Sequence, residues 1–433
     1  MIQLERAAER EILAAVRTEM DSLFGQRDAP TAPDEERLAE LVRVEIARWQ
    51  RARVNSNLTV LPDVAAMEER VMNWLVRLGP LEPLIRNPAY EEIFVDSPRE
   101  VGVIERTGRT VMLPDVYFDN DEEVRELTKR ALAAVGRRVD EASPMVDARL
   151  ADGSRLNVVI PPVSQQHTVL TIRTFRPDVD TLERLVELGT ITNELGLFLR
   201  AAVHAYLNIV VSGPTGSGKT TLLNALGNET DGTGRMIVIE QTRELKLPDL
   251  VPLCVSLEAQ EENAEGVGEI EQRELVRVAL RMRPRRIIVG ETRGAETWDM
   301  LRAMNTGHGG CLSSVHANSP RDALDALITL GMMAPERPPE SVMARLIARS
   351  ISLVIQMAEE PGTGRRLLTH VFEITGLEAS MIQGHDLWLR DELSGRLEWT
   401  GTPPKCMAEF ARKGVPYAIP SAPVLGRTNG VLA

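Results

Sequence analysis

The sequence predicts an α/β protein in which a large α/β domain follows a small α+β domain and an N-terminal helical extension. Apolar residues recur at helical spacing through residues 1–75. Short strand-like runs mixed with one helix occupy 76–176, and strand-length apolar runs alternate with helical segments over 182–433. Residues 177–181, which begin with a proline, are expected to link the last two domains.

The helical extension is predicted from two apolar stripes. One consists of Ile12, Val16, Met20 and Leu23, and the other of Leu38, Val42, Ile46 and Trp49. A break at Pro30–Asp34 separates them. Such stripes usually pack helix against helix, and docking of a partner protein is the alternative role.

Short strands define the α+β domain. They are expected at 93–96, 101–105, 110–113, 146–150, 155–160 and 169–173, with a helix over 124–135 closed by Gly136. Asp152-Gly153 lies between two of these strands, which is a strong hairpin signal. The strands also carry Arg149, Arg155 and Arg173.

Strands and helices alternate in the α/β domain. Strands are expected at 207–212, 236–239, 251–257, 286–289, 310–315 and 352–357, with helices that include 182–188, 195–206 and 219–226. The helix at 219–226 is expected to end at Gly227. This alternation is typical of a mainly parallel sheet.

A glycine-rich stretch joins the strand at 207–212 to the helix at 219–226. It consists of Gly213, Pro214, Thr215, Gly216, Ser217, Gly218, Lys219 and Thr220, followed by Thr221, and its first eight residues fit the phosphate-binding loop pattern. In that pattern the backbone N–H groups and the helix N-terminus hold phosphate oxygens, Lys219 reaches the β- and γ-phosphates, and Thr220 binds Mg²⁺. The alternative is an accidental glycine-rich turn, which would not require the flanking strand and helix. The sequence therefore predicts a nucleotide site.

Composition limits the function classes. The 433 residues are 43% hydrophobic, which supports real cores, while the net charge of −13 and 4% aromatic content argue against nucleic acid as the default partner. Cys254, Cys311 and Cys406 are far apart, so neither zinc nor a disulfide framework is expected. No apolar run approaches the roughly 18 residues of a membrane span, and the charged N-terminus lacks a signal-peptide core. We expect a cytoplasmic protein that meets a membrane only through partners.

Acidic residues that end predicted strands are candidates for the metal and the attacking water. Glu291 follows the strand 286–289 at the carboxyl edge of the sheet, and we expect it to be the general base or to orient water. Glu240 ends another strand and Glu244 follows it closely, so both are expected, with Thr220, to hold the water shell of Mg²⁺. The alternatives are a solvated loop acid and a charged turn.

His316 follows the predicted strand 310–315 and precedes a helix that Ser319 can cap. A contact with the γ-phosphate and a purely structural role are equally open from spacing alone.

Arginines are candidates for stabilising charge during phosphoryl transfer, often from a neighbouring subunit. Arg149, Arg155 and Arg173 are candidates, although arginines on small hairpins are more often solvated or paired. A second group of arginines lies near Glu291 in the sequence: Arg281, Arg283, Arg286 and Arg293. The sequence does not show which of them contact the site and which serve packing.

Several stretches between residues 79 and 416 carry a family resemblance. In the first part they are Gly-Pro-Leu-Glu-Pro-Leu at 79–84, Asp-Ala-Arg-Leu at 147–150, Asp-Gly-Ser-Arg at 152–155 and Ile-Arg-Thr-Phe at 172–175. In the second part they are Leu-Arg-Met-Arg-Pro at 280–284, Ile-Val-Gly-Glu at 288–291, Arg293-Gly294, Met-Asn-Thr-Gly-His at 304–308 and His-Ala-Asn-Ser-Pro at 316–320. With these motifs the chain resembles the type II/IV secretion ATPase superfamily, and within it the tight-adherence (Tad/CpaF-type) pilus assembly ATPases.

The resemblance implies a RecA-like ATPase domain after a PAS-like α+β domain, and a hexameric ring that binds ATP and Mg²⁺ between the two domains. It implies that Glu240 and Glu244 form the acidic box, that Glu291 is the catalytic glutamate and that His316 is the histidine-box residue. It further implies that Arg155 and Arg173 lie near the phosphates. Members of this family drive filament subunits or secreted substrates through an integral-membrane platform protein at the cytoplasmic face of the inner membrane.

Some positions differ from the family pattern. Ala259 and Gln260 stand where an arginine is expected, and both Arg285 and Gln241 replace acids. These differences are expected to affect fine geometry and turnover rate while leaving an active enzyme. The competing readings are a nucleic-acid motor, as in conjugation-type or type IV secretion relatives, and a nucleotide-binding scaffold without turnover.

Overall fold

The computed structural model describes residues 2–24, 35–56, 58–174, 181–260, 267–360, 362–391 and 393–420. The chain divides into two compact units, Met1–Arg176 and Pro177–Ala433. The predicted break at 30–34 and linker residues 177–180 lie outside the described residues, as does the side chain of Leu23.

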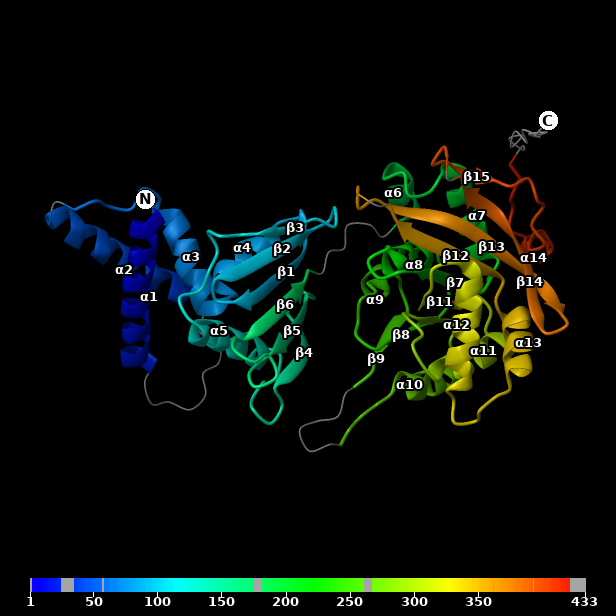
Figure 1. Cartoon of the computed structure of the whole chain (residues 1–433), viewed down its shortest axis with the longest axis horizontal. Helices are drawn as coiled ribbons and strands as arrows, with labels where there is room; N and C mark the ends of the chain where they lie inside the picture. Colours follow the sequence, from blue (N-terminus) through cyan, green and yellow to red (C-terminus); the bar gives the residue numbers. More distant parts are fainter. Residues whose placement is uncertain are drawn as a thin grey trace. The chain divides into compact units, whose positions relative to one another are not determined.

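Three helices form the N-terminal extension: α1 (Ile2–Phe24), α2 (Glu35–Asn55) and α3 (Val64–Val76) (Figure 1). Their apolar stripes meet in one core, which includes Ile12, Val16, Leu38, Val42, Ile46, Met67 and Val71. Asp63 begins α3 by accepting a hydrogen bond from the backbone N–H of Ala66 at 2.9 Å. The prediction that the stripes pack helix against helix is confirmed.

The α+β part follows in the same unit. Its elements are η1 (Gly79–Leu81), α4 (Glu82–Arg86), β1 (Tyr90–Ser97), β2 (Glu100–Glu105), β3 (Thr110–Met112), α5 (Asp121–Ala133), β4 (Met145–Arg149), β5 (Arg155–Val159) and β6 (Val169–Arg173). The strands form a six-stranded antiparallel sheet in the order β3-β2-β1-β6-β5-β4. Val124, Leu127 and Leu132 of α5 share one core with the buried residues of this sheet. The predicted strands and the hairpin at Asp152-Gly153 are confirmed.

The second unit contains a larger sheet. Its elements are α6 (Leu182–Glu187), α7 (Asn193–His204), β7 (Ile209–Gly213), α8 (Lys219–Asn228), β8 (Met236–Glu240), α9 (Leu247–Leu250), β9 (Cys254–Glu258), α10 (Gln272–Ala279), η2 (Leu280–Met282), β10 (Arg286–Val289), α11 (Glu296–Asn305), β11 (Leu312–His316), α12 (Pro320–Met332), α13 (Glu340–Ser350), β12 (Leu353–Glu359), β13 (Arg366–Glu378), β14 (Met381–Arg390), β15 (Leu397–Trp399) and α14 (Met407–Lys413). The nine strands are ordered β15-β14-β13-β12-β7-β11-β10-β8-β9. Strands β7 to β12 run parallel, and β13 to β15 extend the sheet in antiparallel fashion.

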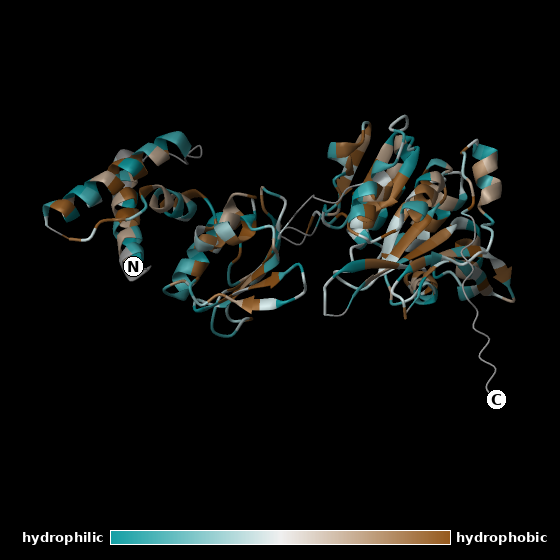
Figure 2. Cartoon of the chain, turned by 90° about the horizontal axis from the view of Figure 1, so that it is seen from above, coloured by the Kyte–Doolittle hydropathy of each residue, from teal (hydrophilic) through white to brown (hydrophobic). Residues whose placement is uncertain are grey.

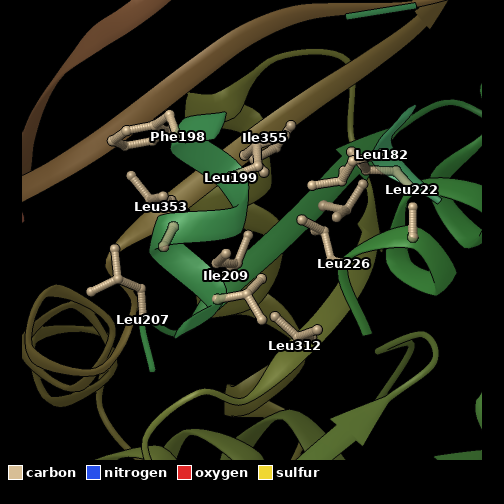
Figure 3. Close-up of a cluster of buried hydrophobic side chains, with 14 of the residues drawn as sticks. Leu182, Phe198, Leu199, Leu207, Ile209, Leu222, Leu226, Leu312, Leu353 and Ile355 are labelled. Carbon is tan, nitrogen blue, oxygen red and sulfur yellow. The ribbon is translucent and has the colours of Figure 1, made fainter. Parts of the chain in front are cut away.

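Helices cover both faces of this sheet. On one face α7 and α8 bring Phe198, Leu222 and Leu226 against Ile209 and Ile355 of the strands (Figure 3). On the other face α11, α12 and α13 pack against the same sheet. Because both faces are buried, the central strands are mainly apolar, which Figure 2 shows as hydrophobic ribbons inside more hydrophilic helices.

Three details differ from the sequence prediction. Strands β13 to β15 were not predicted: His370 interrupts the apolar pattern of β13, His385 and Asp386 interrupt that of β14, and β15 has only three residues. Strand β9 begins at Cys254 rather than at 251. Helix α8 continues through Gly227, where an added Cβ would lie 2.4 Å from a methyl carbon of Leu247, so this glycine permits a close helix contact and does not end the helix.

None of the helices in the described part of the chain combines the length and the apolar character needed to cross a bilayer.

Candidate nucleotide site

The predicted phosphate loop, residues 213–220, lies between β7 and α8. Strand β7 is flanked by β11 and β12, so the loop leaves the middle of the parallel sheet at its carboxyl edge, where ligands of open α/β folds bind. Gly216 and Gly218 have φ angles of +76° and +91°, which favour glycine. A Cβ at Gly213 would lie 2.5 Å from Ser217 Oγ. The loop therefore has the conformation that glycines permit and side chains would block.

Lys219 closes this loop from within the second unit. Its ammonium donates hydrogen bonds to the carbonyl oxygens of Gly213 and Pro214 at 3.0 and 2.9 Å. The side chain is buried, and its Nζ lies 3.4 Å from Nδ1 of His316. The structure thus brings the predicted phosphate-binding lysine and the predicted histidine together.

The two predicted acidic-box residues have different contacts. Glu244 accepts a hydrogen bond from the Thr220 hydroxyl at 3.2 Å, which places a carboxylate beside the predicted Mg²⁺ ligand. Glu240 is buried, and its Oε1 accepts backbone N–H groups of Glu244 and Leu245 at 2.8 and 2.9 Å. The pKa of Glu240 is raised to about 7, chiefly because the side chain is buried; the two backbone N–H groups oppose this rise, and the negative charges of Glu244 and Glu258 add to it. Glu240 therefore fixes the turn that presents Glu244.

Glu291 follows β10 and meets His316 at the neighbouring strand end. Glu291 Oε1 lies 2.5 Å from His316 Nε2, and Oε2 accepts hydrogen bonds from Arg293 at 2.6 Å. Burial lowers the pKa of His316, and the positive charges of Lys219 and Arg293 lower it further against the opposing effect of Glu291. A neutral imidazole can accept at Nδ1 from Lys219, while Glu291 Oε1, although close to Nε2, has no hydrogen-bond partner in the described part of the chain.

Backbone contacts hold Glu291 in register with its neighbours. Ser314 on β11 donates from Oγ to the carbonyl of Gly290 at 2.7 Å, and the N–H of Thr292 donates to the carbonyl of Ser314 at 2.8 Å. Gln272 on α10 donates to the carbonyl of Glu291 at 3.0 Å. Two strands and one helix thereby fix the position of this carboxylate.

Two residues that motif reasoning missed support the loop from β12 and β13. Gln356 accepts a hydrogen bond from Ser212 Oγ and donates from Nε2 to the carbonyl of Ala317 at 3.1 Å, so it joins the strand before the loop to the turn after His316. Arg366 donates from Nε to the carbonyl of Gly216 at 2.8 Å. No local motif marks these residues, because each acts across more than a hundred positions of sequence.

The predicted arginines Arg149, Arg155 and Arg173 belong to the first unit. Arg149 pairs with Arg155 across β4 and β5, and Arg155 pairs with Arg173 across β5 and β6, so they form one row, hereafter the arginine row. Their neighbours Ala148, Leu156 and Ile172 are buried, which places the row on the face opposite the core. Arg155 lies 3.8 Å from Asp147 and Arg173 lies 3.9 Å from Glu91.

The arginines near Glu291 divide into site and packing residues. Arg293 contacts Glu291, whereas Arg286 is buried and donates to the carbonyls of Val203 and Gly310 at 2.6 and 3.3 Å. Arg285, which replaces an expected acid, stacks on the ring of Tyr206 at 4.5 Å and bonds to its hydroxyl. Arg285 and Arg286 therefore serve packing.

These features fit a nucleoside triphosphate with a divalent cation. The Cβ-free cradle of the loop leaves its N–H groups accessible to phosphate oxygens, Lys219 supplies a cation there, and Thr220 with Glu244 supplies oxygen ligands of the kind that Mg²⁺ prefers.

Comparisons with known proteins show which family this chain resembles. The family described as "Type II/IV secretion system protein" matches residues 75–364. A Mycobacterium tuberculosis protein named "Putative conjugal transfer protein" is 35% identical over 326 residues, covering 73% of this chain and 90% of that protein. The type IV secretion system protein VirB11 of Brucella abortus is 32% identical over 340 residues, covering 71% of this chain and 92% of VirB11.

Solved structures are similar as well. The pilus retraction motor PilT with bound ADP has a TM-score of 0.50 and 20% identity, covering 67% of this chain and 81% of PilT, and shows the same type of fold. The VirB11 ATPase of Brucella suis in complex with sulphate is 29% identical, with a TM-score of 0.37, and covers 68% of this chain and 95% of VirB11. The second unit accordingly has the RecA-like ATPase fold, preceded by an N-terminal domain. Because the family match spans well over half of the sequence, this chain belongs to the type II/IV secretion ATPase superfamily.

Proposed function

We propose that this ATPase hydrolyses ATP with Mg²⁺ to drive assembly of a tight-adherence pilus or protein secretion through an inner-membrane platform protein. The observation that carries the proposal is the line of contacts from Lys219 through His316 to Glu291, which puts a phosphate-binding cation, an imidazole and a carboxylate beside one phosphate loop. The motifs between residues 79 and 416 support the choice of a tight-adherence machine.

The ligands would be held by residues of the second unit. The N–H groups of the phosphate loop and Lys219 would bind the phosphates, and Thr220 with Glu244 would face the cation. When bound, Mg²⁺ neutralises charge that develops on the transferred phosphoryl group. Glu240 would contribute by fixing the turn that carries Glu244.

Glu291 would orient the attacking water and accept its proton. Its Oε2 is occupied by Arg293, whereas the buried Oε1 lies beside His316 Nε2 and has no hydrogen-bond partner among the described residues, so Oε1 would be the oxygen that accepts the proton. Neutral His316 would lie against this carboxylate without adding a positive charge.

The chain would act as a hexameric ring, with the arginine row near the phosphates. The three arginines are paired across neighbouring strands, on the face of the sheet that does not pack against the core. Such a row of guanidinium groups is suited to binding a polyphosphate. Arg155 and Arg173 would then stabilise the charge that develops during hydrolysis. The ring would sit peripherally at the cytoplasmic face of the inner membrane and meet the membrane through its platform partner.

Two variants test the enzyme. Lys219→Ala should remove nucleotide binding, and Glu291→Gln should retain ATP binding while losing phosphate release, with Glu271→Gln, an exposed glutamate at the start of α10, as the matched control. Normal turnover in Glu291→Gln would eliminate this glutamate as the base. Loss of surface pili after deletion of the gene would support the pilus machine.

A second candidate is a conjugation-type or type IV secretion ATPase linked to nucleic-acid transfer. The names of the Mycobacterium tuberculosis and Brucella abortus relatives favour it, while the net charge of −13 counts against it. Single-stranded DNA separates the two, because strong stimulation of ATP hydrolysis would support the nucleic-acid motor.

A further inference from the structure

A pocket of about 180 Å³ lies in the first unit, where the helical extension meets the α+β part. It is lined by Arg17 and Met20 of α1, Trp74 and Leu75 of α3, and Arg130 of α5. On the same scale of cavity volume one water molecule needs about 10–15 Å³, so the pocket has room for a group of several heavy atoms. Two cations, an aromatic ring and two apolar side chains thus surround one small space.

The other arginines on the same face of α1 already have partners. Arg6, Arg10 and Arg17 are spaced by four and seven residues, so they lie along one side of the helix. Arg6 donates to the carbonyl of Asp115 at 2.8 Å and stacks on Tyr117, and Arg10 forms an ion pair with Asp119. These contacts dock α1 onto the α+β part through complementary groups.

Arg17 differs from these two arginines. In the part of the chain that the structure describes, no carboxylate forms an ion pair with either Arg17 or Arg130. Arg130 donates one hydrogen bond, to the carbonyl of Arg77 at 2.9 Å. Burial lowers the pKa of Arg130, the positive charge of Arg17 lowers it further, and Glu126 on α5 partly offsets both. Arg17 is exposed and Arg130 is partly buried, and two like charges that line one pocket would be stabilised by an anion between them.

We propose that this pocket binds a small organic phosphate, with the phosphate group between Arg17 and Arg130 and an apolar part against Trp74, Met20 and Leu75. The indole nitrogen of Trp74 already donates to Glu9 at 2.6 Å, so its ring is fixed as a wall. Guanidinium groups are well suited to phosphate oxygens because they present several donors in one plane. The bound phosphate would tie α1 to α5, and most of its contacts precede the segment that matches the secretion family, which begins at residue 75.

Isothermal titration of the full chain tests this site, with Lys219→Ala present throughout to remove binding at the phosphate loop. The probes are inorganic phosphate, phenyl phosphate and phenol at constant ionic strength. Phenyl phosphate should bind more tightly than inorganic phosphate, and phenol should not bind. Arg17→Gln should weaken phenyl phosphate at least tenfold, whereas Arg51→Gln, an exposed arginine on α2, should leave it unchanged. Equal affinities in the two variants, or no binding at all, would overturn the proposal.

A charge reversal provides a second measurement that needs no ligand. Arg17→Glu places a carboxylate opposite Arg130, so this variant should melt at a higher temperature than Arg17→Gln and no longer respond to phenyl phosphate. A melting temperature below that of Arg17→Gln would show that the two guanidinium groups do not share one anion site, and it would refute the assignment.

Discussion

Replacing Glu240 with glutamine should stabilise the fold increasingly as the pH rises. In the folded protein the pKa of Glu240 is near 7, above its ordinary value of 4.5. Between pH 4.5 and pH 7, therefore, Glu240 stays protonated in the folded state but has lost its proton in the unfolded chain. Stability associated with this group is therefore present below about pH 4.5 and is lost as the pH rises through 7. The gap, at about 1.4 kcal/mol for each pH unit, amounts to about 3 kcal/mol.

Glutamine is a suitable replacement because its carbonyl oxygen can still accept the N–H groups of Glu244 and Leu245. Urea unfolding followed by circular dichroism at about pH 5 and pH 8.5 measures the effect. The stability of Glu240→Gln relative to the wild type should increase by up to about 3 kcal/mol between these conditions. Glu187→Gln, at an exposed site on α6, controls for loss of a charge. A difference that is independent of pH, or that falls as the pH rises, would refute the reasoning.

Three further predictions concern the loop, the ring and the core. Arg366→Ala should raise KM for ATP roughly tenfold with a smaller change in kcat, because the loop loses a charged hydrogen bond at Gly216. Arg366→Lys should recover part of the lost affinity. An unchanged KM in steady-state assays would contradict this role. Arg173→Ala should slow phosphate release, and mixing it with Lys219→Ala subunits should restore some activity if sites are shared, so absence of rescue would argue against trans action. Leu222→Ala, at a fully buried position, should lower the free energy of unfolding by about 2–5 kcal/mol in urea titrations, and a loss well below that range would show that the core can collapse around the site.

The sequence predicted the elements whose signals are local. The phosphate loop pattern, the apolar strands beside it and the serine cap before α12 each lie within a few residues, and all of them appear in the structure. Glu291 was expected at the carboxyl edge of the sheet, where β10 ends, whereas the sequence left the role of His316 open and the structure places it beside Lys219 and Glu291.

Contacts between distant segments could not be predicted in this way. Gln356 and Arg366 reach the loop from strands that come more than a hundred residues later, and their own neighbours in sequence carry no motif. Glu240 shows the opposite case, since its motif was recognised but its burial, which decides its chemistry, depends on the packing of Gly290 against its side chain. The pocket between Arg17 and Arg130 likewise could not be predicted, because its lining comes from α1, α3 and α5, which are far apart in the sequence.

The position of Arg366 has a practical consequence for anyone who shortens this protein. The segment that matches the secretion family ends at residue 364, two positions before the arginine that holds the carbonyl of Gly216. A chain cut at that family border would keep every recognised motif, yet it would lose the antiparallel strands β13 to β15 together with the brace of its nucleotide loop, and it would leave β12 without its antiparallel neighbour. Boundaries chosen by homology alone would thus remove part of the machinery that they are meant to preserve.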